Sequence, residues 1–449
     1  MGVVNRTTVL RIRYIEPALA AVALATVAIC TRCGASPQTA AAAAEASSLG
    51  SNAERRTPAS SEPTNASTDK RSALEVTHAV VSGDATHPKL STWSAAVVDL
   101  RSGRRSAPLR ILWFGDSHAA ADFWPSSVRK SLSAVLPAAG PGYLALGVPN
   151  YRHGMARLWR AGGLDISPHP PARRSTEDDG VFGLGGTRVT MKDSTALVTM
   201  KLTFEGASTA KINYELFYRT TSETDLLALS LGEERREFGP TKESIGGISS
   251  LRFDSDGRRT VEIRALRGQP QLFGVVAETE TPGFVLDTLG INGARFGTPL
   301  AWQKESFSAV LAARHPLVAV VAYGTNEVFD EEAVARHAER QRQFIERLRA
   351  AVPDIGCIVA GPTDVGRGGT AAAERVAALD EAERSTAEEL GCIYFSPYQL
   401  ISKEGGFIAW QKSEPPLALS DGIHFTARGY SRLGEAMAQQ CFNLRPRAE

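Results

Sequence analysis

One segment constrains the fold of this chain more than any other, the continuous apolar run Leu-Val-Ala-Val-Val-Ala-Tyr at residues 317–323. It lacks the polar–apolar alternation of a strand with one solvated face. Such a run is typical of a parallel sheet that helices cover on both faces. Apolar residues at helical spacing follow at 331–352, and another apolar strand is expected at 357–361. Strand–helix alternation of this kind predicts an α/β domain.

The same alternation occurs elsewhere in the chain. Toward the C-terminus we expect a helix at 370–390, a strand at 392–396 and a helix from about 427 to 440. Nearer the N-terminus, a buried strand at 109–114 precedes a helix at 119–136, and the Gly- and Pro-rich residues 137–163 indicate a loop. Residues 105–165 and 284–449 are therefore expected to form one domain, a parallel sheet with helices on both faces.

A segment of different character interrupts this pattern. Residues 166–283 contain several short runs in which apolar and polar residues alternate, separated by Gly, Asp, Ser and Pro. Short strands with turn signals between them are typical of a small β-sandwich. We therefore expect an inserted β-rich module between the two parts of the α/β domain.

The N-terminal residues are not expected to belong to the fold. Residues 1–34 combine a basic start with a short apolar stretch at 17–29, which favours a secretory signal over a membrane-spanning helix of roughly 20 residues. An uncleaved membrane anchor is the alternative. Residues 35–75 are rich in Ala, Ser, Thr and Pro and cannot bury enough apolar surface to fold. The chain is therefore expected to be exported to the periplasm or cell envelope, with this segment as a disordered linker.

Three cysteines fall in the part that is expected to fold, Cys357, Cys392 and Cys441. Cys357 and Cys392 each begin a strand-like run, so buried thiols are the simplest expectation. A disulfide between two of the three is compatible with export, and the spacing alone does not decide.

The residues Gly115-Asp116-Ser117-His118 follow the strand expected at 109–114. In an open α/β sheet, ligands bind beyond the carboxyl ends of the strands, so this turn is a candidate site. Ser117 could be a nucleophile, favoured by the N-terminus of the next helix. Alternatively, Asp116 and His118 could be metal ligands.

Two further motifs could supply donors to an oxyanion. Gly293 lies in Leu-Gly-Ile-Asn-Gly-Ala-Arg at 289–295, where a glycine lets a backbone N–H approach a carbonyl closely; an ordinary turn glycine is the alternative. Asn326 lies in Gly-Thr-Asn-Glu directly after the strand at 317–323, so its amide would project at the same sheet edge. An Asx turn that caps the next helix is the alternative there.

A fourth motif, Ser-Asp-Gly-Ile-His-Phe-Thr at 420–426, carries Asp421 and His424 on one short loop. A carboxylate can hold Nδ1–H of the imidazole while Nε2 points at a serine, which is the relay that activates a serine at neutral pH. The alternative is a helix-capping aspartate beside a surface histidine.

In this order, the Gly-Asp-Ser, glycine, Gly-Thr-Asn-Glu and Asp-Gly-Ile-His motifs resemble those of the SGNH (GDSL-type) hydrolases. The resemblance implies that Ser117 is the nucleophile and that Asp421 and His424 complete the catalytic set. It also implies an oxyanion hole of the Ser117 N–H, Gly293 and Asn326, with Gly290 as a nearby alternative to Gly293. Glu327 replaces the aspartate usual in the third motif.

A narrower resemblance concerns the longer stretches Gly-Asp-Ser-His-Ala-Ala-Ala-Asp-Phe-Trp and Val-Leu-Asp-Thr-Leu-Gly-Ile-Asn-Gly-Ala, with a β-rich insert between them. They are similar to the bacterial peptidoglycan O-acetylesterases, whose insert resembles a carbohydrate-binding module. The resemblance implies an esterase that removes O-acetyl groups from an envelope polysaccharide, first peptidoglycan and second another acetylated glycan. Five aromatic residues are candidates to line a sugar cleft, although packing is the ordinary role for most of them: Trp124, Tyr143, Tyr151, Trp159 and Trp302.

Other functions are less well supported by the sequence. Metal catalysis would leave His118 as a lone nitrogen ligand with no second cluster, so no metal or other cofactor is expected and His118 is interpreted as structural. A net charge of +1 gives nucleic-acid binding no electrostatic support. An O-acetyltransferase with the same serine site, a non-catalytic polysaccharide-binding protein and a lipid esterase are the alternatives, and the sequence does not separate hydrolase from transferase.

Overall fold

A computed structural model describes residues 81–149, 151–168, 178–204, 210–240 and 245–446. The predicted signal segment at 1–34 and the predicted linker at 35–75 lie outside these residues. In the part of the chain that is described, no helix has the length and apolar character needed to cross a membrane.

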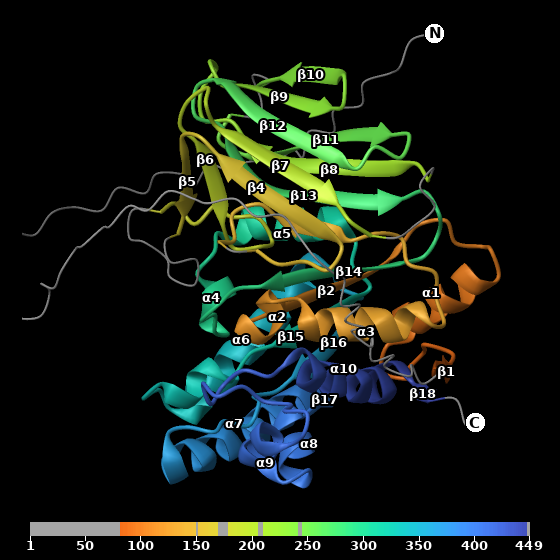
Figure 1. The fold of residues 1–449 in the computed structure, drawn as a ribbon, viewed down its shortest axis with the longest axis vertical. Coiled ribbons are helices and arrows are strands. Elements are labelled where there is room, and N and C mark those ends of the chain that lie inside the picture. The colour runs from red at the N-terminus through yellow and green to blue at the C-terminus, as the bar shows by residue number, and fades with distance from the viewer. Residues whose placement is uncertain (1–80, 150, 169–177, 205–209, 241–244, 447–449) are drawn as a thin grey trace, which may run out of the picture. The chain divides into compact units, whose positions relative to one another are not determined.

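A five-stranded parallel sheet carries the motifs (Figure 1). In spatial order its strands are β14 (Phe284–Gly290), β2 (Leu109–Gly115), β15 (Val318–Ala322), β16 (Gly356–Ala360) and β17 (Ile393–Phe395). Every neighbouring pair in this order is parallel. The predicted fold class, a parallel α/β sheet of the SGNH-hydrolase type interrupted by a β-sandwich, is confirmed.

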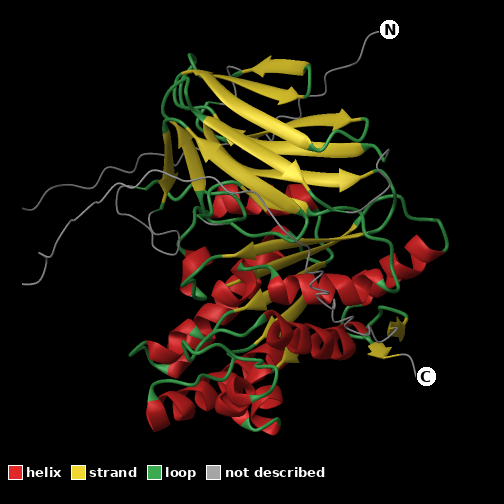
Figure 2. Ribbon diagram, viewed as in Figure 1, coloured by secondary structure: helices red, strands yellow, loops and turns green. Residues whose placement is uncertain are grey.

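Helices cover both faces of this sheet, which is why its strands are apolar throughout (Figure 2). On β2, Ile111 and Trp113 enter one core, and Leu112 and Phe114 enter the other. The first core includes side chains of α1 (Ser91–Arg101), α3 (Phe123–Ser133) and α10 (Ala427–Phe442). On the opposite face lie α5 (Lys304–Arg314), α6 (Val334–Ala351) and α7 (Gly369–Glu389).

The helix expected at 119–136 is interrupted. The structure has a short helix α2 (Ser117–Ala120) and then α3, with Asp122 between them in the left-handed region at φ +62°. The Asp122 carboxylate is buried and accepts hydrogen bonds from Thr288 Oγ1 at 2.7 Å and from the Gly154 N–H at 2.6 Å. These contacts come from distant segments, and they hold the chain in a conformation that local sequence alone does not favour.

The β-rich part forms two packed antiparallel sheets (Figure 2). One sheet has the order β10 (Glu234–Phe238), β9 (Leu226–Leu231), β12 (Thr260–Arg267), β7 (Leu197–Leu202) and β4 (Ala156–Ala161). The other has the order β11 (Ile248–Ser255), β8 (Ile212–Arg219), β13 (Gln271–Thr279), β6 (Arg188–Met191) and β5 (Leu164–Ser167), with β3 (Gly142–Ala145) also paired to β13. Apolar side chains of both sheets form one core.

The structure corrects the expected extent of this module. The segment 137–163, expected to be loop, contains β3 and β4, and both pair with strands of the antiparallel sheets. The antiparallel part therefore begins before residue 166. The α/β part likewise begins before residue 105, because Trp93 and Val97 of α1 pack into its core.

The remaining short elements lie at the edges. The strands β1 (Val81–Gly83) and β18 (Leu444–Pro446) pair with each other. The others are α4 (Gly297–Leu300), the 3-10 helix η1 (Asn326–Phe329), α8 (Pro397–Lys403) and α9 (Gly406–Lys412).

The cysteines differ from the simplest expectation. Cys357, in β16, and Cys392, just before β17, form a disulfide, whereas Cys441 is a buried free thiol. The two strands are neighbours in the sheet, so the pairing follows from tertiary structure that the spacing of 35 residues does not reveal. The expectation of free thiols is wrong for this pair.

Candidate active site

The predicted site residues meet at the carboxyl end of the parallel sheet. Ser117 follows β2, Gly293 follows β14 and Asn326 follows β15. Since β2 lies between β14 and β15, these three positions are adjacent in space. His424 comes from the loop before α10, and its imidazole reaches Ser117 directly.

Ser117, His424 and Asp421 form a hydrogen-bonded chain. His424 Nε2 lies 2.9 Å from Ser117 Oγ, and His424 Nδ1 lies 2.7 Å from Asp421 Oδ2. The other Asp421 oxygen, Oδ1, accepts the N–H groups of Ile423 and His424 at 2.9 Å each. One carboxylate therefore both folds the loop and orients the imidazole.

These hydrogen bonds stabilise the ionised form of Asp421. Partial burial pushes the pKa of Asp421 upward, but the two backbone N–H groups and the His424 imidazole outweigh it and hold the pKa at about 2. The loop reverses at Gly422, where φ is +77°, and ends where the Thr426 hydroxyl caps α10 by accepting the Gly429 N–H at 3.2 Å. The sequence Asp-Gly-Ile-His-Phe-Thr thus encodes both the turn and the helix start.

Asp116 fixes the turn that carries Ser117. Its Oδ1 accepts the His118 N–H at 2.9 Å, so it is the N-cap of α2, and Ser117 is the first residue of that helix. Burial raises the pKa of Asp116 to about 7, and the nearby Glu327 carboxylate adds to this rise, although the bond from the His118 N–H acts in the opposite direction.

Gly290, at the end of β14, packs closely against α2. A Cβ at this position would lie 2.3 Å from the Ala120 nitrogen. Gly290 is therefore a packing glycine.

The Asn326 amide lies at this sheet edge, as the sequence predicts, but it is already hydrogen-bonded. Nδ2 donates to the Ala294 carbonyl at 3.0 Å and to Asp116 Oδ2 at 3.3 Å. The longer bond is the one that an incoming oxyanion could replace, because hydrogen bonds at active sites often reach their working geometry only with substrate bound.

Gly293 has the left-handed backbone for which glycine is suited, with φ +77°. Its carbonyl accepts a hydrogen bond from Arg295 Nη1 at 2.8 Å, and Arg295 pairs with Asp330 at 2.6 and 2.8 Å. The loop after β14 is therefore tied to the end of η1, which holds Gly293 and Asn326 in a fixed relation.

Glu327 is a functional candidate that sequence analysis noted only as a substitution. It is 2% exposed, and its two oxygens accept the Phe296 N–H at 2.9 Å and the Gly324 N–H at 3.2 Å. One carboxylate thus joins the loop after β14 to the loop after β15. Beneath it, His337 Nδ1 lies 3.8 Å away, and His337 Nε2 contacts Glu383 Oε1 at 2.9 Å. A Cβ on Gly324 would lie 2.3 Å from that Glu383 oxygen, which explains the glycine.

His118 is a buried structural residue, as interpreted from the sequence. Its Nδ1 lies 2.9 Å from Tyr430 Oη and its Nε2 lies 3.3 Å from Thr363 Oγ1. Burial lowers the pKa of His118 to about 3, so the ring is neutral. Thr363 and Tyr430 were not predicted; the position of Thr363 three residues after the end of β16, at the same sheet edge, was the available signal. Among the described residues, no three His, Cys, Asp or Glu side chains gather as a metal centre.

The five aromatic candidates are mostly packing residues. Trp124, Tyr143 and Trp302 are buried, and Tyr151 is partly buried. The packing role that is expected for most of the five is therefore confirmed for Trp124, Tyr143 and Trp302. Trp159, on the edge strand β4, is the exception, with 52% of its surface exposed.

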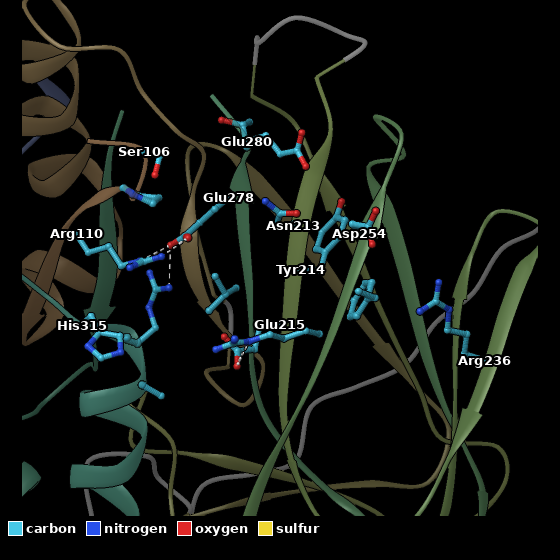
Figure 3. Close-up of a pocket in the computed structure, with 17 residues that line it drawn as sticks. Ser106, Arg110, Asn213, Tyr214, Glu215, Arg236, Asp254, Glu278, Glu280 and His315 are labelled. Carbon is cyan, nitrogen blue, oxygen red and sulfur yellow. Dashed lines mark hydrogen bonds and ion pairs between the residues drawn. The ribbon is translucent and has the colours of Figure 1, made fainter. Parts of the chain in front are cut away.

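A pocket of about 850 Å³ lies away from the serine, near the N-terminal residues of β2 (Figure 3). Glu278 lies between Arg110 and Arg314 there, at 2.7 and 2.8 Å. Burial acts to raise the pKa of Glu278, but the two guanidinium groups hold it at about 2. Arg314 also pairs with the buried Asp287 at 2.9 Å. These ion pairs connect the antiparallel and parallel sheets, so their evident role is structural.

In chemical terms, the arrangement around Ser117 can accept the hydroxyl proton and hold the His424 imidazole in one orientation. It can also present N–H groups to a developing negative charge. These are the requirements of acyl transfer through a serine.

Comparison with known proteins agrees with this chemistry. The GDSL-like Lipase/Acylhydrolase family matches residues 255–432, a segment that contains Gly293, Asn326, Asp421 and His424 but not Ser117. A search of curated protein sequences found no match.

Solved structures show the likeness of fold. A peptidoglycan O-acetylesterase is similar at a TM-score of 0.65 and 20% identity, covering 81% of this chain and 98% of that one. A family two carbohydrate esterase from Cellvibrio japonicus has a TM-score of 0.24 and 9% identity, covering 64% and 98% of the two chains. A lipase/acylhydrolase from Enterococcus faecalis has a TM-score of 0.29 and 17% identity, covering 37% and 80%. The first of these shares the fold; the other two likenesses are too slight to support an argument.

The fold, the motifs and the matched segment lead to one assignment. Residues 255–432 match the GDSL-like Lipase/Acylhydrolase family, and the chain shares the fold of a solved esterase, which together indicate ester hydrolysis.

Proposed function

We propose that the protein is a serine esterase that removes O-acetyl groups from an envelope polysaccharide, with peptidoglycan as the first substrate. The observation that carries the proposal is the contact of 2.9 Å between Ser117 Oγ and His424 Nε2, with Asp421 at 2.7 Å behind the imidazole. Ser117 is the nucleophile, His424 the general base and acid, and Asp421 the group that orients His424.

In the first half of the reaction, Ser117 Oγ attacks the acetyl carbonyl carbon while its proton passes to His424 Nε2. The tetrahedral intermediate collapses, the bond between carbon and the sugar oxygen breaks, and His424 returns the proton to the leaving hydroxyl. Acetyl-Ser117 remains. Water then attacks this ester with His424 as base, and acetate and free Ser117 are released.

The oxyanion formed in both halves is bound by the Ser117 N–H, the Gly293 N–H and the Asn326 amide. Asn326 turns one N–H from Asp116 toward the oxyanion, giving up its longer contact of 3.3 Å. The backbone N–H groups of Ser117 and Gly293 need no such change as charge develops, and donors of this kind lower the barrier most effectively.

The choice of substrate rests on three kinds of support. The structural neighbour at a TM-score of 0.65 is a peptidoglycan O-acetylesterase. The residues 1–34 have the features of an export signal, and the residues 35–75 those of a tether. An exported esterase with a β-rich module is suited to an extended glycan outside the cytoplasm.

The test compares the full chain with its Ser117→Ala variant. Acetate release is measured from O-acetylated peptidoglycan and acetylated xylan, beside hydrolysis of a short aryl acetate. Release from peptidoglycan that disappears in Ser117→Ala supports the proposal. Aryl acetate turnover without release from either glycan contradicts the glycan substrate, and acetyl transfer to an added glycan hydroxyl would then identify a transferase. A folded protein inactive on all three substrates contradicts the esterase assignment.

A further inference from the structure

We propose that Arg367 and Phe329 form a substrate subsite beside Ser117 that binds a carboxylate carried by the acetylated glycan. This inference rests on the proposed function and makes the substrate class more specific: a glycan with a carboxylate near the acetyl ester.

Phe329 lies on the side of the site that carries Asn326. Both belong to η1, the 3-10 helix Asn326–Phe329, so Phe329 is less than two turns from the proposed oxyanion donor. Its ring is 42% exposed. Its neighbour Val328 is buried in an apolar cluster, so Phe329 is the apolar side chain of this turn that remains open to solvent.

Arg367 lies on the loop after β16, next to the loop that carries the proposed base. The Gly366 N–H donates to the Gly422 carbonyl at 2.8 Å, and a Cβ on Gly422 would lie 3.1 Å from the Arg367 Cβ. Gly422 directly follows Asp421 and is two residues from His424. Arg367 therefore borders the catalytic loop, and it is exposed.

The two side chains contact each other. The Arg367 guanidinium carbon lies 4.9 Å from the centre of the Phe329 ring, which is within the range of a cation–π interaction. This contact joins the loop that follows β16 to the turn that follows β15. It also holds the guanidinium at the rim of the site instead of letting it extend into solvent.

The charge of Arg367 is not neutralised by a neighbouring acid. Among the described residues, no carboxylate forms a salt bridge with Arg367, and its guanidinium lies over the Phe329 ring. Nearby arginines do have oxygen partners: Arg295 pairs with Asp330 at 2.6 Å, and Arg375 donates to the Glu332 carbonyl at 2.6 Å. An exposed guanidinium stacked on a ring keeps the N–H groups along its edge free to bind a carboxylate of the substrate.

Two more exposed apolar side chains lie near the catalytic loop. Phe123, at the start of α3, and Leu419, two residues before Asp421, are each 42% exposed. The Leu419 N–H donates to the His424 carbonyl at 2.8 Å, so this side chain belongs to the catalytic loop. Phe123, Phe329 and Leu419 are thus three exposed apolar side chains, from α3, η1 and the catalytic loop, that lie near this site.

These features define the ligand chemistry. An exposed phenyl ring can stack on the C–H face of a sugar, and a guanidinium binds a carboxylate through two parallel N–H bonds. A neutral acetylated glycan would use only the ring. Peptidoglycan, whose peptide stems carry carboxylates, and acetylated uronic-acid glycans would use both. The subsite therefore favours an acidic acetylated glycan over a neutral one.

The test compares matched esters and glycans with Arg367→Gln. The small pair is 4-acetoxybenzoate and its methyl ester, which differ in one carboxylate; the glycan pair is O-acetylated peptidoglycan and neutral acetylated xylan. For each pair we divide kcat/KM for the acidic substrate by kcat/KM for the neutral one. We expect Arg367→Gln to lower this ratio about 10- to 100-fold. Arg367→Lys should restore part of the ratio, and added salt should reduce it. The control Arg235→Gln removes an exposed arginine from β10, in the β-rich module, and should leave both ratios as in the parent protein.

The outcomes separate the two proposals. The subsite proposal is overturned if both ratios in Arg367→Gln equal those of the parent protein. It is also overturned if Arg235→Gln lowers the ratios as much as Arg367→Gln does. If the parent protein releases acetate from neither glycan, the proposed function fails, and the ratio for the small pair still decides the subsite. Phe329→Leu tests the ring separately. If kcat/KM falls much more for the glycans than for the small methyl ester, the result supports stacking of a sugar on the ring. Equal falls for the two kinds of substrate contradict it.

Discussion

The Glu327 carboxylate accepts the Phe296 N–H at 2.9 Å, and this one bond links the loops that carry Gly293 and Asn326. The second carboxylate oxygen accepts the Gly324 N–H at 3.2 Å. Because Glu327 is buried, neither N–H group has water as a substitute partner. Two proposed oxyanion donors from different strands are thereby held by a residue that does not contact the ester itself.

We predict that Glu327→Gln lowers kcat about 10- to 100-fold with a much smaller change in KM, because displaced donors weaken binding of the transition state more than of the substrate. A glutamine oxygen can replace only one of the two acceptors. Steady-state kinetics on an aryl acetate measures the split. The control is Glu331→Gln, which changes an exposed glutamate four residues further along the chain. A rise of KM in Glu327→Gln with kcat unchanged would contradict this positioning role.

We predict that Asn326→Ala lowers kcat on the order of 10²–10³-fold, the usual loss for one oxyanion donor. The substitution also removes the bonds to the Ala294 carbonyl and to Asp116. Circular dichroism and thermal unfolding should therefore accompany the kinetics. If kcat falls less than about 3-fold in a folded variant, Asn326 is not an oxyanion donor.

Asp421→Asn should lower kcat on the order of 10²–10⁴-fold, because the amide no longer fixes the tautomer of His424. The native carboxyl has a pKa of about 2, held down against burial by two backbone N–H groups and by His424. Asp421 is thus ionised throughout pH 4–9, and the predicted loss is the same across that interval. A loss confined to one end of this interval would show that Asp421 titrates during catalysis.

Asp116→Asn should change the pH dependence of stability. Burial raises the pKa of Asp116 from 3.8 to about 7, so the folded protein binds this proton more tightly than the unfolded chain does. The free energy of unfolding contributed by Asp116 is therefore full below about pH 4 and is lost as pH rises through about 7. At 1.36 kcal/mol per pKa unit the shift amounts to about 4 kcal/mol, an upper figure for the change that Asp116→Asn should abolish. Urea unfolding of both proteins from pH 4 to pH 8 measures the difference; parallel curves would contradict the raised pKa.

Removing the disulfide should reduce stability without affecting catalysis. Cys357 and Cys392 lie near the amino ends of β16 and β17, opposite the end of the sheet that carries Ser117. Closing a loop of 35 residues stabilises the folded state by about 3–4 kcal/mol in the chain-entropy description. The double variant Cys357→Ala/Cys392→Ala should unfold at lower urea concentration and keep the kcat of the parent at 25 °C. A large loss of kcat in the folded double variant would show coupling between the two ends of the sheet.

The sequence predicted the core of the site because its signals are local. Each motif directly follows or precedes an apolar segment, and the carboxyl ends of parallel strands necessarily share one edge. The proximity of Ser117, Gly293 and Asn326 follows from that rule. His424 does not directly follow a strand of the sheet, and its contact with Ser117 across 307 positions was predicted from the order of the motifs. The same logic holds for Asn326, since its strand is apolar without alternation and so had to be an inner strand.

The features that sequence analysis missed depend on long-range contacts. Asp122 interrupts a helix because Thr288 and Gly154 bond its carboxylate, and neither residue is near it in sequence. Strands β3 and β4 were interpreted as loop because they are short and lie among glycines and prolines, and they become strands by pairing with β13 and β7. The roles of Glu327 and Arg367 likewise depend on which loops the sheet brings together.

The position of the β-rich module between β2 and β14 has a consequence for how the chain folds. These two strands are nearest neighbours, yet the whole module separates them in sequence. Where the chain enters and leaves the module, the Ala139 N–H donates to the Phe284 carbonyl and the Thr279 N–H donates to the Ala139 carbonyl, at 2.8 and 2.9 Å. A module that folds first therefore holds its own ends together and delivers β14 beside β2 at little further cost in loop-closure entropy. Closing β2 on β14 thus costs less entropy in a chain whose module is already folded, and substitutions that weaken the core of the antiparallel sheets should slow refolding of the catalytic sheet even where they leave the active site intact.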